Sequence, residues 1–176
     1  MVAADLFMLP FRFLHIVAGV LWVGSAFLFV GFIGPSAAEV GPSAGPLLTA
    51  AVKKRKVVKV INTVAMITIA AGWVMWIRDA TEAQSLGDWV TSAYGFALTL
   101  GGAIATITFF VGYYGIGRNV ERLVDLGNEV AAGGGPPSPE QDAEMQRLGG
   151  ELERHGKMDL AGLLIAVTLM ATARYW

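Results

Sequence analysis

The sequence has no cysteine and few charged residues. Without cysteine, the chain cannot form disulfides, thiolate metal sites, cysteine-ligated iron–sulfur clusters or a cysteine nucleophile. Charged residues make up only 15% of its 176 residues, whereas soluble domains usually carry about 25%. No basic tail of the kind that binds nucleic acid is present, and the formal net charge is -1. With a hydrophobic content of 55%, this composition indicates one integral membrane domain whose main partner is the lipid bilayer.

Four apolar segments are long enough to cross a membrane. A bilayer core of about 30 Å requires roughly 20 residues of apolar helix. The segments that qualify cover residues 10–33, 57–77, 90–116 and 158–176. We therefore expect residues 1–176 to form a single all-α domain, a bundle of four transmembrane helices. The first segment lacks the basic residues that precede the apolar part of a signal peptide, so we expect it to be a true span.

The basic residues are concentrated in two of the three connections. Residues 34–56 with Lys59, and residues 117–157, hold ten of the thirteen lysines and arginines. Because basic loops stay on the cytoplasmic side, we expect these loops to be cytoplasmic and both termini to lie outside. At the outer boundary the sequence predicts an aromatic belt of Trp73, Trp76, Trp89, Tyr175 and Trp176.

The third connection also predicts a helix that begins at Pro139. Ser138 is suited to the N-cap, and proline is favoured at the first helical position. This helix could continue into the fourth span. There Asp159, close to the cytoplasmic boundary, is expected to face water or to pair with Lys157 or a loop arginine.

One face of the first span combines polar, small and aromatic residues. At spacings of three and four, this face holds Arg12, His15, Gly19, Trp22, Ala26 and Phe29. A titratable group within a span usually faces the bundle interior, so we expect His15 to face inward. Three roles are open for it: an internal hydrogen bond, a proton relay, or an axial ligand to haem iron.

The stretch "LHIVAGVLWVGSAFLF" resembles a superfamily of small bacterial integral membrane proteins. The matching residues are Leu14, His15, Ala18, Gly19, Trp22, Gly24 and Phe27. The superfamily includes copper-resistance D-type domains, the membrane domain that precedes cytochrome c in some urate oxidases, HemJ-type protoporphyrinogen oxidases and several families of unknown function. The resemblance implies haem or redox chemistry carried by His15, in a multi-pass protein of the bacterial plasma membrane.

The chain departs from these relatives because it lacks further transmembrane histidines. His155, the only other histidine, is expected to lie about 25 Å from His15 in depth, too far to share one iron. Met170 matches the predicted depth of His15 and could be the sixth ligand, although plain packing is also open for it. Met75, a second His15 from another copy of the chain, or an open position are the alternatives.

These observations predict an integral membrane protein that binds haem b for redox chemistry or electron transfer. His15 would ligate the iron, Arg12 could pair with a propionate, and Trp22 and Met170 complete the candidate site. The alternative is a non-catalytic scaffold, accessory subunit or small transporter component without a cofactor. The sequence shows no catalytic acid–base pair, and it leaves open a homo-oligomer or a larger membrane complex.

Overall fold

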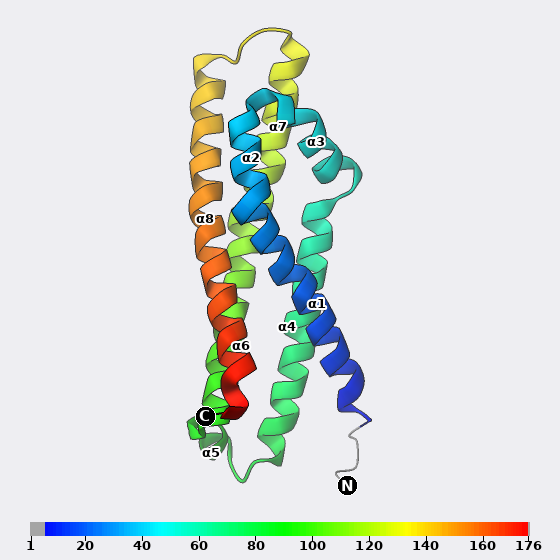
Figure 1. Cartoon of the computed structure of the whole chain (residues 1–176), viewed down its shortest axis with the longest axis vertical. Coiled ribbons are helices and arrows are strands. Elements are labelled where there is room, and N and C mark those ends of the chain that lie inside the picture. The colour runs from blue at the N-terminus through cyan, green and yellow to red at the C-terminus, as the bar shows by residue number, and fades with distance from the viewer. Residues whose placement is uncertain (1–5, 176) are drawn as a thin grey trace.

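The computed structural model describes residues 6–175, and every regular element in that range is helical. Four helical rods are long and apolar enough to cross a membrane, which confirms the predicted all-α, four-helix fold. The rods run roughly along one axis, and the described residues begin and end at the same end of the bundle (Figure 1). We call this end, which also holds α5 (Leu86–Thr91), the terminal end. The opposite end, with α2 (Gly34–Val40), α3 (Gly45–Thr49) and α7 (Arg118–Gly133), is the basic end.

The first rod extends well past the predicted end of the first span. Helix α1 (Met8–Leu28) continues through the π-helical segment η1 (Phe29–Ile33) directly into α2. The rod ends at Gly41, where φ is 65°, a conformation that glycine adopts without a steric penalty. The chain then turns through three short helical segments, which are η2 (Gly41–Ala44), α3 and the π-helical η3 (Ala50–Lys54). Most of the expected loop 34–56 is therefore helical.

Polar contacts join this first connection to α7. Lys53 forms an ion pair with Asp125 at 2.8 Å. Thr49 Oγ1 donates a hydrogen bond of 2.9 Å to Asn128 Oδ1. Because both pairs are exposed, each adds only modest stability. Their main consequence is positional: the two basic connections lie against each other at one end of the bundle.

The second and third rods are joined by a short helical turn at the terminal end. Helix α4 (Val57–Glu82) leads through α5 into α6 (Ala93–Val111). Ser92 caps α6, since its side chain accepts a hydrogen bond from the Gly95 N–H. Helix α6 then continues through the π-helical segment η4 (Gly112–Gly117) into α7, so the third rod also projects beyond its apolar part.

The fourth rod is a single helix with a polar first half and an apolar second half. Helix α8 (Pro139–Thr172) ends in the 3-10 segment η5 (Ala173–Tyr175). Ser138 accepts a hydrogen bond from the Gln141 N–H, and the Gln141 side chain accepts one from the Ser138 N–H. This reciprocal capping box confirms the predicted start of the helix. The helix also continues into the fourth span without a break.

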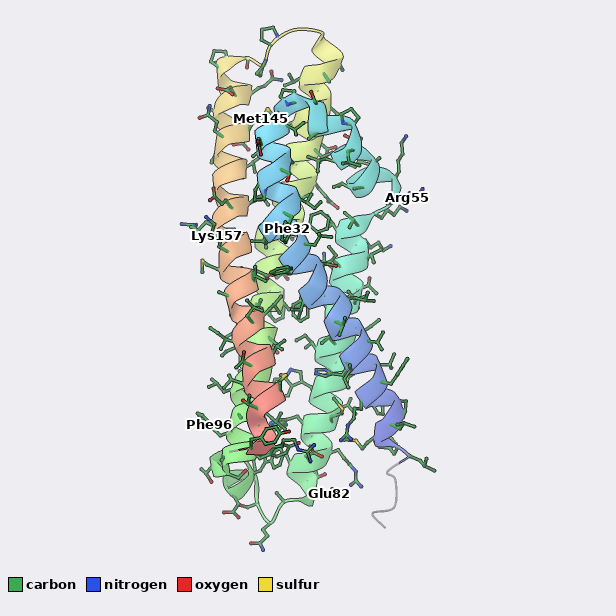
Figure 2. The ribbon with its side chains drawn as sticks, viewed as in Figure 1. Phe32, Arg55, Glu82, Phe96, Met145 and Lys157 are labelled. Atoms are coloured by element: carbon green, nitrogen blue, oxygen red, sulfur yellow. The ribbon has the colours of Figure 1, made fainter. Side chains whose placement is uncertain are left out.

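The bundle core lies where all four rods meet. Trp22, Ala65 and Leu163 form its buried centre, and Phe109 packs against them. Small residues carry many of the other helix contacts, as expected for membrane helices; the buried ones include Ala18, Ala71, Ala97, Gly101, Ala105, Ala166 and Ala173. Large apolar side chains such as Phe96, labelled in Figure 2, are exposed on the outside of the rods, where lipid would cover them.

Three tryptophans of the expected aromatic belt make contacts inside the bundle. Trp73 Nε1 donates to Thr106 Oγ1 at 3.1 Å, and Trp76 Nε1 donates to Thr99 Oγ1 at 2.8 Å. Both indoles therefore tie α4 to α6, and the position of the belt in a lipid interface stays a prediction. Trp89 is buried, with only 9% of its surface exposed. Of the remaining two, Tyr175 is exposed, whereas Trp176 lies outside the described residues.

Candidate functional site

His15 lies on the face of α1 that packs against α4, in the half of the bundle nearer the terminal end. Its Nδ1 atom is 2.8 Å from the backbone carbonyl oxygen of Thr68. A carbonyl oxygen can only accept a hydrogen bond, so Nδ1 carries the proton and donates it. In the neutral ring, Nε2 then keeps its lone pair. His15 therefore faces into the α1–α4 contact, with one nitrogen fixed and the other available as a ligand or acceptor.

A glycine on α4 makes room for the imidazole. A Cβ atom at Gly72 would lie 2.9 Å from both Cε1 and Nδ1 of His15, so no other residue fits there without a shift. One turn along α1, a Cβ atom at Gly19 would lie 3.4 Å from Thr68 Cγ2. These two close approaches hold α1 against α4. As a result, the ring of His15 is positioned by the backbone of α4.

Trp22 and Arg12 share the face of His15 but differ in their surroundings. Trp22 is only 5% exposed and meets Phe109 edge-on, with ring centroids 6.3 Å apart. It therefore belongs to the packed core between the rods. Arg12 is exposed, one turn from His15 toward the terminal end. The inward face predicted for α1 is thus confirmed from His15 to Ala26, but it does not include Arg12.

Met170, the candidate sixth ligand, packs on a different helix from His15. Its Cγ and Cε atoms lie 3.1 and 3.4 Å from the position of a Cβ atom at Gly101 on α6. His15 contacts α4, whereas the contacts of Met170 run to α6. Joint ligation of one iron by these two residues stays a prediction, and packing accounts for Met170 on its own.

The two histidines of the chain belong to different levels of the bundle. His155 packs on Gly115, and its neighbour Gly156 packs on Val30 of η1. Fifteen residues of the first rod separate His15 from Val30, which is about 20 Å at the helical rise. The two imidazoles are therefore too far apart to ligate the same metal ion, in line with the prediction from the sequence.

Asp159 shows a clear departure from the sequence-based expectation. It does not face water, because only 6% of its surface is exposed. Nor does it pair with Lys157, which points away from the bundle (Figure 2) and binds Glu153. Its Oδ1 atom is buried without a hydrogen-bond partner among the described residues. The expectation was wrong because sequence position alone does not say which side of α8 meets η4.

The hydrogen bond that His15 makes is typical of a histidine that ligates a metal. Histidine ligands of metals usually donate their second ring N–H to a carbonyl or carboxylate, which fixes the ring and raises its basicity. The bond from His15 to the Thr68 carbonyl has this form. Residues 6–175 contain no group of three or more His, Asp or Glu side chains that could hold a metal ion. No protein-family model, curated protein or solved structure matches the chain.

Proposed function

We propose that the protein is a multi-pass protein of the bacterial plasma membrane that binds haem b and serves redox chemistry or electron transfer. The observation that carries the proposal is the hydrogen bond from His15 Nδ1 to the Thr68 carbonyl, which leaves Nε2 as the ligand atom. The resemblance of residues 14–27 to small bacterial haem and redox membrane proteins supports the same role for His15.

Each residue near His15 would have a defined task. The carbonyl oxygen of Thr68 holds the imidazole in the tautomer that binds iron. Gly72 leaves space for the ring, and the exposed guanidinium of Arg12 is available to a haem propionate. Bound haem would supply one-electron chemistry, and the surrounding apolar helices would limit the access of water to it. Met170 remains a candidate for the sixth position.

A second function is favoured by the same hydrogen bond. The Thr68 carbonyl satisfies Nδ1 without any cofactor, and the ring fills the space above Gly72. In that case His15 fastens α1 to α4, and the protein is a scaffold, an accessory subunit or a small transporter component. Either function allows a homo-oligomer or a larger membrane complex.

The absorption spectrum of protein purified from haem-replete cells distinguishes the two functions. The haem proposal predicts a Soret band in the parent and its loss in His15→Ala with the helical content retained. The matched control is His155→Ala, because His155 is the only other histidine and lies at another level. A colourless parent contradicts the proposal, as does unchanged haem content in His15→Ala. If haem is bound, a shifted spectrum in Met170→Leu would identify the sixth ligand.

A further inference from the structure

A row of titratable side chains runs along α8 from its polar half into the bundle. Arg147, Glu151, His155 and Asp159 follow one another at intervals of four residues and so lie on one face of the helix. This face is turned toward the third rod. Asn119 of α7 donates a hydrogen bond of 2.9 Å to Glu151, and Asp159 lies against η4. The row therefore leads from the basic end into the contact between α8 and the third rod.

The pairing of these side chains changes along the row. Glu144 accepts from both Arg122 and Arg147, and Glu151 accepts from Arg147 and Asn119. Deeper in the bundle, two atoms of this row lack hydrogen-bond partners. Both His155 Nδ1 and Asp159 Oδ1 are buried and have no hydrogen-bond partner among residues 6–175. Two adjacent, unpartnered polar groups in an apolar bundle are costly unless something binds them.

Glycines of a π-helical segment lie directly opposite the two groups. A Cβ atom at Gly112 would lie 3.1 Å from Asp159 Oδ1, and one at Gly115 would lie 3.0 Å from His155 Nδ1. Both glycines belong to η4, where the helix is widened. π-Helical turns are rare and frequently occur at functional sites. The unpartnered oxygen and nitrogen thus face the backbone of η4, with no intervening side chain from these two positions.

No facing element supplies a positive charge to Asp159. Segments η1 and α6 contain no Asp, Glu, Lys, Arg or His, and the nearest titratable residues of η4 are Tyr113 and Tyr114. Four basic residues nearby are engaged elsewhere: Arg118 lies over the Tyr114 ring, Arg122 and Arg147 bind Glu144, and Lys157 binds Glu153. Arg12 is the one Asp, Glu, Lys or Arg residue of α1, and it lies in the first turns of that helix, at the far end of the bundle.

The donor set is too small for a metal ion. Metal sites in proteins take four to eight ligands, largely from protein side chains in structural sites. Here the unpartnered atoms are one carboxylate oxygen and one imidazole nitrogen, and the described residues offer no group of three His, Asp or Glu side chains that could hold a metal ion. A proton needs only one of these atoms, and both a carboxylate and an imidazole accept it.

We propose that His155 and Asp159 form a proton-binding site between α8 and η4, which protons reach from the basic end of the bundle. Glu151 is partly exposed, His155 is partly exposed with a buried Nδ1, and Asp159 is buried. The three residues therefore lead stepwise from the surface to the interior, one helical turn apart. This site is independent of haem and of His15.

Infrared difference spectroscopy of the full-length protein in lipid vesicles, titrated with pH, tests this site. We expect a carbonyl-stretch band from a protonated, buried carboxyl group that exchanges in D₂O and is lost in Asp159→Asn. His155→Gln should shift the pH midpoint of the band. Asp142→Asn is the control, because Asp142 is on the same helix but exposed, and it should leave the band unchanged.

Other results of this experiment would contradict the proposal. A parent without such a band, or a band that persists in Asp159→Asn, overturns the proposal. A band removed by sodium at constant pH, but not by choline, would show a cation site in place of a proton site and also overturns it. If Asp159→Asn does not fold, Gly112→Ala provides the test instead, because the new Cβ would lie 3.1 Å from Asp159 Oδ1. A shifted band in that variant supports the site, and an unchanged band contradicts it.

Discussion

His15 on α1 and Thr68 on α4 are joined by a hydrogen bond of 2.8 Å between Nδ1 and a backbone carbonyl, across 53 residues of sequence. Thr68 also donates its own hydroxyl proton to the Val64 carbonyl one turn earlier. The side chain of Thr68 is thereby fixed on α4, while its carbonyl holds the imidazole. This contact defines the orientation of His15 whether or not haem is bound.

The first prediction concerns the space above Gly72. In Gly72→Ala, the new Cβ would lie 2.9 Å from two ring atoms of His15, so the ring must move and the hydrogen bond to Thr68 weakens. Overpacking of this kind costs about 1–3 kcal/mol. We expect a lower melting temperature in detergent and a changed ¹⁵N signal of the His15 ring. Gly102→Ala is the control, since its Cβ would make an ordinary contact of 3.7 Å with Trp73. Equal effects of the two variants would contradict the close contact at Gly72.

The second prediction concerns the turn between α5 and α6. A Cβ atom at Gly95 would clash with the backbone carbonyl of Trp89, which cannot move away as a flexible side chain could. Gly95→Ala should therefore destabilise the fold by more than about 3 kcal/mol, beyond usual overpacking. Ser92→Ala removes the cap of α6 and the hydrogen bond that the Ser92 hydroxyl donates to the Trp89 carbonyl, and should cost about 1–2 kcal/mol. Thermal unfolding followed by circular dichroism compares the two, and a milder effect at Gly95 would argue against this turn.

The third prediction concerns the indole of Trp76. Thr99 Oγ1 accepts the Trp76 Nε1 hydrogen bond at 2.8 Å and donates its own proton to the Gly95 carbonyl. Thr99→Val keeps the shape but leaves a partly buried N–H without a partner, a loss of about 1–3 kcal/mol. Thr99→Ser retains the hydroxyl and should stay close to the parent. Unfolding midpoints and tryptophan emission measure both. If valine and serine give the same result, the indole does not depend on this hydroxyl.

Local patterns in the sequence predicted the parts of the fold that depend on neighbouring residues. The four apolar runs predicted the four spans, and Ser138 with Pro139 predicted the start of α8, because apolar length and capping chemistry act within a few residues. The inward face of α1 followed from the spacing of His15, Gly19 and Trp22, since helical periodicity brings such residues together. These features need no knowledge of the partner helix.

Features that depend on pairing between distant helices could not be predicted in this way. Nothing near His15 in the sequence identifies the Thr68 carbonyl as its hydrogen-bond partner, because the two residues meet only when α1 packs on α4. The burial of Asp159 likewise depends on Gly112, 47 positions earlier, which lets α8 approach η4. The spacing of His155 and Asp159 was visible, and so was the glycine-rich stretch "GYYGIG", but their contact was not.

The fourth prediction concerns orientation in the membrane. Ten of the thirteen basic residues belong to the connections at the basic end, so this end should be cytoplasmic and the terminal end outside. The chain has no cysteine, so single-cysteine variants report one position each without background. In intact cells, Ser43→Cys and Gly135→Cys at the basic end should resist an impermeant thiol reagent. Gln84→Cys at the terminal end should react, because residue 84 is exposed between α4 and α5. Ser85 is less suited as a probe, since its hydroxyl caps α5.

Permeabilised cells supply the control for this experiment. All three positions are exposed, so all three variants should react once the membrane is opened. Reaction of Ser43→Cys or Gly135→Cys in intact cells, with protection of Gln84→Cys, would reverse the orientation. The proton-binding site at His155 and Asp159 would then open to the outside, because the row of side chains on α8 begins at the basic end. The labelling pattern therefore also determines from which side of the membrane the site would take up protons.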